Sequence, residues 1–456
     1  MKKEIDMLHG SLWDKILLFA LPLAATGVLQ QLFNAADIAI VGNFTGDKGT
    51  ACMAAVGANT PIIGLIVNTV VAISLGTNVV VAHSIGTGDD ETVSRAVHNS
   101  VIFALLAGIA IAVIGEILAP QILFSQNVPN DVLPFAVKYL RIYFLGLPVI
   151  LLYNFEAAVY RGVGDTRTPL IILTISGVIN VFLNIAFVLG FGMDVEGVAI
   201  ATVVSNLISC AFLFIKLMKS DKSIRIDLKK LKINWDVLKR ILYIGVPTGA
   251  QNVAFCIANL IIQASINTLG ITVMAASSAA FNIEIFCFCV MSSFAQACTT
   301  FVGQNNGAGN MDRCRKILGI CFLETVIAQA ASLALIYFFG RNFLTLFTQD
   351  PAVIEVGYSR LLIILMAYIL SMVYENMAGY LRGFEISVLP AILTIIAICG
   401  SRIAWIYLVF PVHHTFEVIM AAYPLSFLTA DIMVGIALLV KRPSQRNNKV
   451  LQVENQ

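Results

Sequence analysis

The stretch Gln-Gln-Leu-Phe-Asn-Ala-Ala-Asp, residues 30–37, places a carboxylate inside a long apolar run. Apolar sequence continues on both sides of Asp37, from Ile16 to Val41. On membrane-insertion scales an aspartate at the centre of a spanning helix costs roughly 2.5–3.5 kcal/mol, so such a residue should have a partner or a function. The run therefore predicts a membrane-spanning helix in which Asp37 needs polar partners from neighbouring helices.

The composition is that of a membrane protein with many spans. Of the 456 residues, 58% are hydrophobic and 12% are charged, and the mean hydropathy is +0.86. Soluble proteins carry about twice that charged share, roughly 25%. The net charge of +2 gives no reason to expect a nucleic-acid partner. The first apolar run is too long for a signal-peptide core, so we expect an uncleaved first span.

Apolar segments of spanning length recur along the whole chain. A bilayer needs about 20 apolar residues per helix, and roughly twelve segments meet that length. The sequence therefore predicts an all-α integral membrane protein with about twelve transmembrane helices. The segments are 12–42, 51–82, 92–119, 130–160, 168–190, 194–216, 238–267, 272–302, 314–340, 351–380, 388–410 and 418–440.

A basic, polar stretch divides these helices into two sets. We expect an N-terminal six-helix lobe at 1–216, a basic linker at 217–237, a C-terminal six-helix lobe at 238–440 and a tail at 441–456. Lysine and arginine concentrate in the linker, the tail and every second loop, so these segments should share the cytoplasmic side. Both termini are then cytoplasmic.

The two halves repeat each other. Arg161-Gly162 recurs as Arg382-Gly383, and Gly86-Thr87-Gly88-Asp89 recurs as Gly307-Ala308-Gly309-Asn310, both 221 residues later. Matched loop residues at one spacing indicate an internal duplication. An even number of helices per half gives both bundles the same topology, so a pseudo-twofold axis along the membrane normal should relate them.

These residues resemble those of a known family. The segments 300–309 (Thr-Phe-Val-Gly-Gln-Asn-Asn-Gly-Ala-Gly), 160–169 (Tyr-Arg-Gly-Val-Gly-Asp-Thr-Arg-Thr-Pro) and 195–202 (Val-Glu-Gly-Val-Ala-Ile-Ala-Thr), together with Asp37, are similar to motifs of bacterial multidrug and toxic compound extrusion (MATE) transporters. The resemblance covers nearly the whole chain. It implies a cation-coupled antiporter of the inner membrane that exports organic, often cationic or amphipathic, compounds by alternating access between two lobes.

The resemblance also implies a cation-coupling site in the N-terminal lobe, at Asp37, Asn180, Asn184 and Thr202. Asn180 and Asn184 are four residues apart, so they share one helix face. Their amide oxygens, a hydroxyl and one carboxylate are ligands for Na⁺, or hydrogen-bond partners for a protonated Asp37. Asn184 stands where many relatives carry a second aspartate, which weakens the Na⁺ alternative. A purely structural, hydrogen-bonded Asp37 is the other alternative.

Further polar residues within the apolar runs are candidates for a second site. Glu284, with Gln30 and Gln251, is a candidate substrate site or second cation site. Arg402 and Asp431 are expected to form a structural ion pair between neighbouring spans.

Other functional classes fit less well. A lipid-linked saccharide flippase of the same wider superfamily is the main alternative, but it should carry more basic residues in its spans. The nine cysteines form no CxxC or Cys/His cluster, and no nucleophile elbow or phosphate loop is present, so we expect neither an enzyme nor a cofactor. The expected partners are small organic substrates and membrane lipids. Nothing demands an oligomer, so a monomer is expected.

Overall fold

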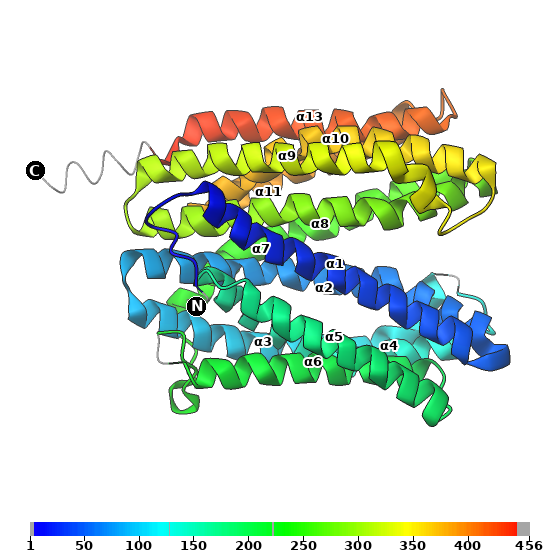
Figure 1. Ribbon diagram of the computed structural model, residues 1–456, viewed down its shortest axis with the longest axis horizontal. Coiled ribbons are helices and arrows are strands. Elements are labelled where there is room, and N and C mark those ends of the chain that lie inside the picture. The colour runs from blue at the N-terminus through cyan, green and yellow to red at the C-terminus, as the bar shows by residue number, and fades with distance from the viewer. Residues whose placement is uncertain (1–3, 127, 221–222, 445–456) are drawn as a thin grey trace, which may run out of the picture. The chain divides into compact units, whose positions relative to one another are not determined.

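The computed structural model describes residues 4–126, 128–220 and 223–444, and over these residues all regular secondary structure is helical (Figure 1). The first half contains α1 (Trp13–Phe44), α2 (Gly49–Thr87), α3 (Asp90–Ser125), α4 (Leu133–Gly162), α5 (Arg167–Ile185) with a π-helical continuation (Ala186–Gly190), and α6 (Val195–Met218). The second half contains α7 (Trp235–Asn267), α8 (Ile271–Gly307), α9 (Met311–Leu344), α10 (Pro351–Gly383), α11 (Val388–Thr394), a π-helix (Ile395–Gly400), α12 (Ser401–Leu408) and α13 (Phe416–Lys441). Short 3-10 turns lie at Gly46–Lys48 and Leu228–Lys230.

The prediction of an all-α membrane protein with twelve spans is confirmed. Twelve helical segments of 21 to 39 residues are long and apolar enough to cross a bilayer, with α11, the π-helix and α12 forming one of them. A helix satisfies its backbone N–H and C=O groups internally, which is what the hydrocarbon core requires. The predicted segments coincide with these helices, and α2 extends further than expected at both ends.

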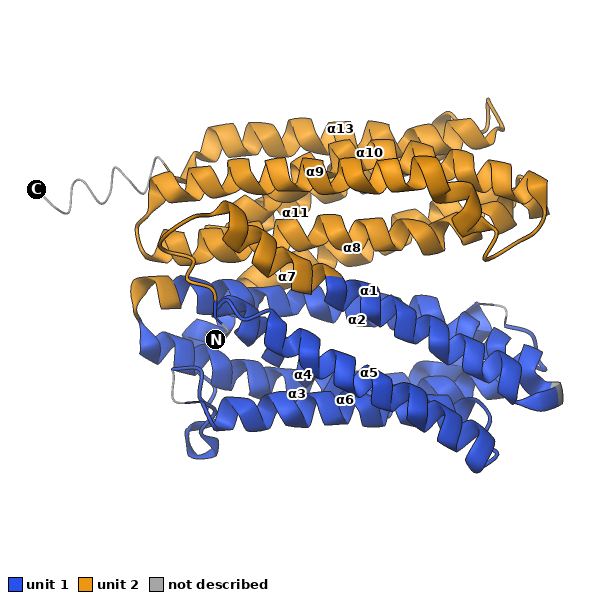
Figure 2. Cartoon of the chain, viewed as in Figure 1, with its two compact units in different colours: residues 1–4, 25–84, 89–242 blue, residues 5–24, 85–88, 243–456 orange. Residues whose placement is uncertain are grey.

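The chain divides into two compact units (Figure 2). Unit 1 consists of residues 1–4, 25–84 and 89–242, and unit 2 of residues 5–24, 85–88 and 243–456. The division runs through α1, whose first half belongs to unit 2 and whose second half, with Asp37, belongs to unit 1. The lobe boundaries expected at 216 and 238 remain predictions. Residues 221–222 of the linker and 445–456 of the tail lie outside the described residues.

Unit 1 is built around α4. This helix packs against α3 and α6, and α5 packs against α6. Gly108 of α3 lies so close to α4 that a Cβ there would approach the Pro148 Cα to 2.4 Å. Small residues at helix contacts let backbones approach closely, which is how membrane helices gain packing energy without a hydrophobic driving force.

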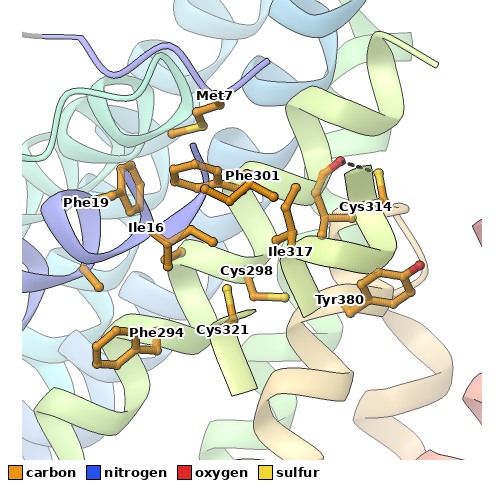
Figure 3. Packing of buried hydrophobic residues seen from close by; sticks show 14 of the residues in the cluster. Met7, Ile16, Phe19, Phe294, Cys298, Phe301, Cys314, Ile317, Cys321 and Tyr380 are labelled. Carbon is orange, nitrogen blue, oxygen red and sulfur yellow. Dashed lines mark hydrogen bonds between the residues drawn. The ribbon is translucent and has the colours of Figure 1, made fainter. Parts of the chain in front are cut away.

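Unit 2 is built around α10, which packs against α8, α9 and α13. The first half of α1 adds Ile16 and Phe19 to an apolar cluster with α8, α9 and α10 (Figure 3). Phe19 meets Phe301 edge to face, with ring centroids 5.6 Å apart. The cluster also contains Cys298 and Cys321, which act as small apolar side chains.

The repeat seen in the sequence extends to backbone conformation. Gly88 and Gly309, 221 residues apart, end the tight turns before α3 and α9 with φ of 73° and 72°. Gly164 and Glu385, also 221 residues apart, have φ of 90° and 63° in the turns before α5 and α11. A positive φ favours glycine, so Glu385 adopts a conformation that costs roughly 1–2 kcal/mol.

Candidate cation-coupling site

Asp37 is buried in unit 1 and contacts neutral donors. Its side chain is 5% exposed. The Asn184 Nδ2 donates to Asp37 Oδ1 at 2.6 Å, and the Thr202 Oγ1 donates to Asp37 Oδ2 at 3.2 Å. Over the described part of the chain, no basic side chain forms an ion pair with this carboxylate. Three helices, α1, α5 and α6, therefore bring the predicted residues together around an acid without a fixed counter-charge.

The two asparagines lie on one face of α5, as their spacing predicts. Asn184 Nδ2 also donates to Asn180 Oδ1 at 3.2 Å, and Asn180 Nδ2 lies 3.5 Å from Thr202 Oγ1. Asn184 is fully buried, at 0% exposure. The helix changes to π geometry at Ala186, directly after this pair. Such π segments occur frequently at functional sites.

The hydrogen-bond inventory of this cluster leaves one acceptor unused. Both N–H groups of the Asn184 amide are directed to oxygens, but its own Oδ1 is buried and lacks a hydrogen-bond partner among the described residues. The single Thr202 hydroxyl hydrogen has two acceptors in range, Asp37 Oδ2 and, at 2.9 Å, Val198 O. The cluster thus carries one negative charge and more acceptors than donors. It can take a proton or a small cation with oxygen ligands.

Two tyrosines of α4 complete the surroundings of Asp37. Tyr139 and Tyr143 are buried, their stacked rings have centroids 6.5 Å apart, and both interact electrostatically with the Asp37 carboxylate. The sequence alone does not single out these two residues. Their i,i+4 spacing in an apolar run was the available signal, but it does not distinguish ordinary packing from a site.

Glu284 forms an ion pair with an arginine of the protein, so its carboxylate is not free to pair with a cationic substrate. Arg360 of α10 donates through Nε to Glu284 Oε1 at 2.6 Å and through Nη2 to Oε2 at 3.1 Å, inside unit 2. Both side chains are 4% exposed. Gln251 of α7 is buried, with its Oε1 unpartnered among the described residues, and Gln30 of α1 is half-buried in unit 1. A role for these three residues in substrate binding stays a prediction.

The expected ion pair between Arg402 and Asp431 is corrected by the structure. Arg402 donates to Ser426 Oγ and Asn259 Oδ1, both at 3.0 Å, and its guanidinium lies over the Tyr423 ring, 4.4 Å from the centroid. Asp431 Oδ1 has no hydrogen-bond partner among the described residues. Since Ser426 is level with Arg402, Asp431 lies five residues further along α13, about 7.5 Å away along the helix axis.

The carboxylate site has no acidic counterpart in unit 2. At the 221-residue spacing Asp37 corresponds to Ala258, which is buried. Thr202 corresponds to Tyr423, the residue under Arg402. The matching region of unit 2 therefore contains a guanidinium where unit 1 contains a carboxylate. No cluster of three metal-ligating His, Cys, Asp or Glu side chains occurs over the described residues.

Sequence comparison identifies the family. The MatE family model matches residues 22–186 and 247–408, which include most of both halves. A probable multidrug resistance protein, NorM, of Thermotoga maritima is 28% identical over 85% of this chain and 84% of its own length. The probable multidrug resistance protein YoeA of Bacillus subtilis is 26% identical over 93% of each chain.

Structural comparison gives the same fold. An outward-facing multidrug resistance MATE transporter of the MOP superfamily has a TM-score of 0.87 at 20% identity, covering 98% of this chain and 99% of its own. A MATE structure in a bent conformation has a TM-score of 0.87 at 21% identity, with full coverage of both chains. With twelve spans and bacterial relatives, this is a multi-pass inner-membrane protein. The chain belongs to the MatE family, whose members are transporters of small compounds and not enzymes.

Proposed function

We propose that this protein is a cation-coupled antiporter that exports organic, cationic or amphipathic compounds by alternating access, and that Asp37, Asn180, Asn184 and Thr202 bind the coupling ion. The observation that carries this proposal is Asp37: a carboxylate at 5% exposure, bonded only to neutral donors. A buried charge without a counter-ion is costly in a bilayer. The acid is therefore most stable when a proton or a cation neutralises it.

The contacts of Asp37 are compatible with a bound proton. A carboxylic acid and a primary amide are complementary, because the acid O–H donates to the amide oxygen while the amide N–H donates to the acid carbonyl. Asn184 already donates to Asp37 Oδ1, and its own Oδ1 is an unused acceptor. Sodium needs oxygen ligands, so the Asn184 amide would have to turn its oxygen toward the ion. H⁺ and Na⁺ both remain alternatives, and the proton requires the smaller change.

The charge state of Asp37 explains how the coupling ion and the substrate would be exchanged. With Asp37 neutralised, the cluster can remain closed and dry; with Asp37 ionised, the unpaired charge favours a state in which water or a cationic substrate reaches it. Binding of the ion and of the substrate then compete for one carboxylate. That competition is the requirement for antiport, since neither state allows both to leave together.

The names of the relatives support the substrate class. The NorM and YoeA relatives are named as probable multidrug resistance proteins, and a relative from Staphylococcus saprophyticus, 18% identical over 82% of each chain, is named as the multidrug export protein MepA. These relatives do not favour the flippase alternative. We extend multidrug export to this chain as part of the proposal, with both termini cytoplasmic, lipid around the spans and a monomer as the working unit.

The test is dye efflux measured in inside-out membrane vesicles. Cells expressing the protein provide the vesicles, and a pH gradient or a Na⁺ gradient is imposed separately while a fluorescent organic cation is followed. We expect one of the two gradients to drive dye accumulation, and that gradient identifies the coupling ion. Dye movement that responds to neither gradient would overturn cation-coupled antiport.

A matched substitution separates the site from general effects. Asp131 lies exposed in the loop before α4, so Asp131→Asn makes the same chemical change away from the site. We expect Asp37→Asn to abolish gradient-driven accumulation and Asp131→Asn to preserve it, at equal membrane levels. Equal accumulation by both variants would remove Asp37 from the mechanism.

A further inference from the structure

Glu324 is a buried acid of unit 2 that the site around Asp37 does not use. It lies in α9, one turn after Cys321 of the apolar cluster shown in Figure 3. The residue is 4% exposed, and both carboxyl oxygens lack a hydrogen-bond partner among the described residues. A polar group buried without a hydrogen bond costs several kcal/mol, and an ionised one costs far more.

The polar side chains around Glu324 are short of donors. Asn376 of α10 donates to Thr325 Oγ1 at 3.2 Å, which brings this part of α10 against the turn of α9 that carries Glu324. Asn376 Oδ1 is unpartnered, as are both polar atoms of Gln329, one turn after Thr325 on α9. Asn376 and Gln329 are each 1% exposed. This part of α9 and α10 therefore buries four side-chain oxygens without partners, two of Glu324 and one each of Asn376 and Gln329, but only one such nitrogen, that of Gln329.

The charged groups nearby do not compensate an ionised Glu324. From α1, Asp14 interacts with it as a like charge. On α10, Glu375 already pairs with Arg382 at 3.7 Å. From α8, the Cys298 thiol donates to the Asn376 carbonyl at 3.8 Å and carries no charge in that role. No lysine, arginine or histidine of the described residues forms an ion pair with Glu324.

We propose that Glu324 is a proton-binding site in unit 2, separate from Asp37. A proton on the carboxyl removes the buried charge and adds an O–H donor to a region with more unpartnered acceptors than donors. The inference goes beyond the coupling role of Asp37 and does not depend on it.

Infrared spectroscopy of the purified, reconstituted protein tests this inference without transport. A protonated carboxylic acid has a C=O stretching band that shifts in D₂O, and Gln has no such band. We expect Glu324→Gln to lose one component of the wild-type carboxylic acid band at neutral pH. Glu355→Gln, at an exposed glutamate paired with Arg341, is the matched control and should leave the band unchanged.

Several outcomes overturn the proposal. One is a carboxylic acid band in Glu324→Gln identical to that of the wild type. Another is a Glu324 carboxylate signal that responds to Na⁺, because the site would then bind a metal cation. Asp37→Asn separates the two sites: the component lost in Glu324→Gln should persist in Asp37→Asn, and its loss there would assign that component to Asp37. If Glu324→Gln does not fold, Asn376→Ala should shift the frequency of the same component, and an unshifted band contradicts the proposal.

Discussion

The ion pair between Glu284 and Arg360 gives the sharpest stability prediction. Glu284→Gln leaves the Arg360 guanidinium buried, since that side chain is 4% exposed, and removes a carboxylate that accepts from two of its nitrogens. The third nitrogen, Nη1, is already unpartnered among the described residues. Removing one partner of a buried pair costs about 3–5 kcal/mol. The Gln oxygen replaces at most one of the two charge-assisted bonds.

The same bidentate geometry occurs on the surface of unit 2 and provides the control. Arg341 donates to Glu355 at 2.7 Å and 3.0 Å, but the two side chains are 52% and 61% exposed. Solvent screens an exposed pair, so its contribution to stability is far smaller than that of a buried pair. At about 2–4 °C per kcal/mol for a unit of this size, Glu284→Gln should lower the Tm by about 6–20 °C, and Glu355→Gln should lower it by clearly less.

Thiol labelling during heating is a suitable assay, because buried cysteines become reactive on unfolding. Cys287 is buried one turn from Glu284 and reports directly on this region. The double variant Glu284→Gln with Arg360→Gln removes both charges and should recover much of the lost stability. A Tm decrease for Glu284→Gln no larger than that for Glu355→Gln would refute the reasoning.

Three further substitutions test separate parts of the structure. Gly108→Ala places a methyl group 2.4 Å from the Pro148 Cα and should destabilise unit 1 by about 1–3 kcal/mol, whereas Gly64→Ala, in a helix with open space at the Cβ, should not; equal Tm values would contradict this packing. Asp89→Ala should lower the free energy of unfolding by about 1 kcal/mol, because Asp89 caps α3 by accepting from the Thr92 N–H at 2.9 Å. Its repeat counterpart Asn310 makes no side-chain cap, so Asn310→Ala should leave stability unchanged. The Thr92 hydroxyl and amide hold the pKa of Asp89 below its usual range, so this contribution is complete above about pH 4 and is lost as the pH falls through the lower pKa of the folded state; unfolding measured across that range checks the sign. Asn184→Asp adds a second carboxylate beside Asp37 and should increase the response of dye efflux to a Na⁺ gradient, and an unchanged response would argue against a shared ion site.

The sequence predicts the Asp37 cluster well because its members are constrained by local rules. Asn180 and Asn184 share a face through helical spacing, and an isolated acid in an apolar run needs polar partners. The hydrogen bonds from Asn184 and Thr202 to Asp37 are what these rules, together with the family resemblance, lead one to expect. The unused acceptor on Asn184 was not predictable, because it depends on how the amide is turned.

Pairings between distant spans were harder to predict. Glu284 and Arg360 are 76 residues apart in the chain, and nothing in either apolar run indicates that the two side chains meet at one depth. Arg402 and Asp431 have opposite charges, but Asp431 lies five residues beyond Ser426, the residue of α13 that contacts Arg402. That difference in depth is enough to prevent the ion pair. Depth along a helix depends on loop lengths and on helix tilt, which spacing within one segment does not determine.

Glu324 was missed although the rule applied to Asp37 also selects it. It is an acid in the middle of an apolar run, 314–340, with no charged residue within the next two turns toward the end of α9. What the sequence could not provide is how deeply Glu324 is buried, at 4% exposure. The same charge at the edge of a helix bundle would reach lipid headgroups or water, and it would then need no proton.

Asp37 is the centre of the proposed mechanism, and gradient-driven efflux by Asp37→Asn tests it most directly. Inside-out vesicles containing the wild type, Asp37→Asn or Asp131→Asn are supplied with the same external dye, and dye accumulation is compared with and without the imposed gradient. We expect Asp37→Asn to show no response to either a pH or a Na⁺ gradient, while Asp131→Asn responds like the wild type. A gradient response retained by Asp37→Asn would contradict the assignment of Asp37 as the coupling residue.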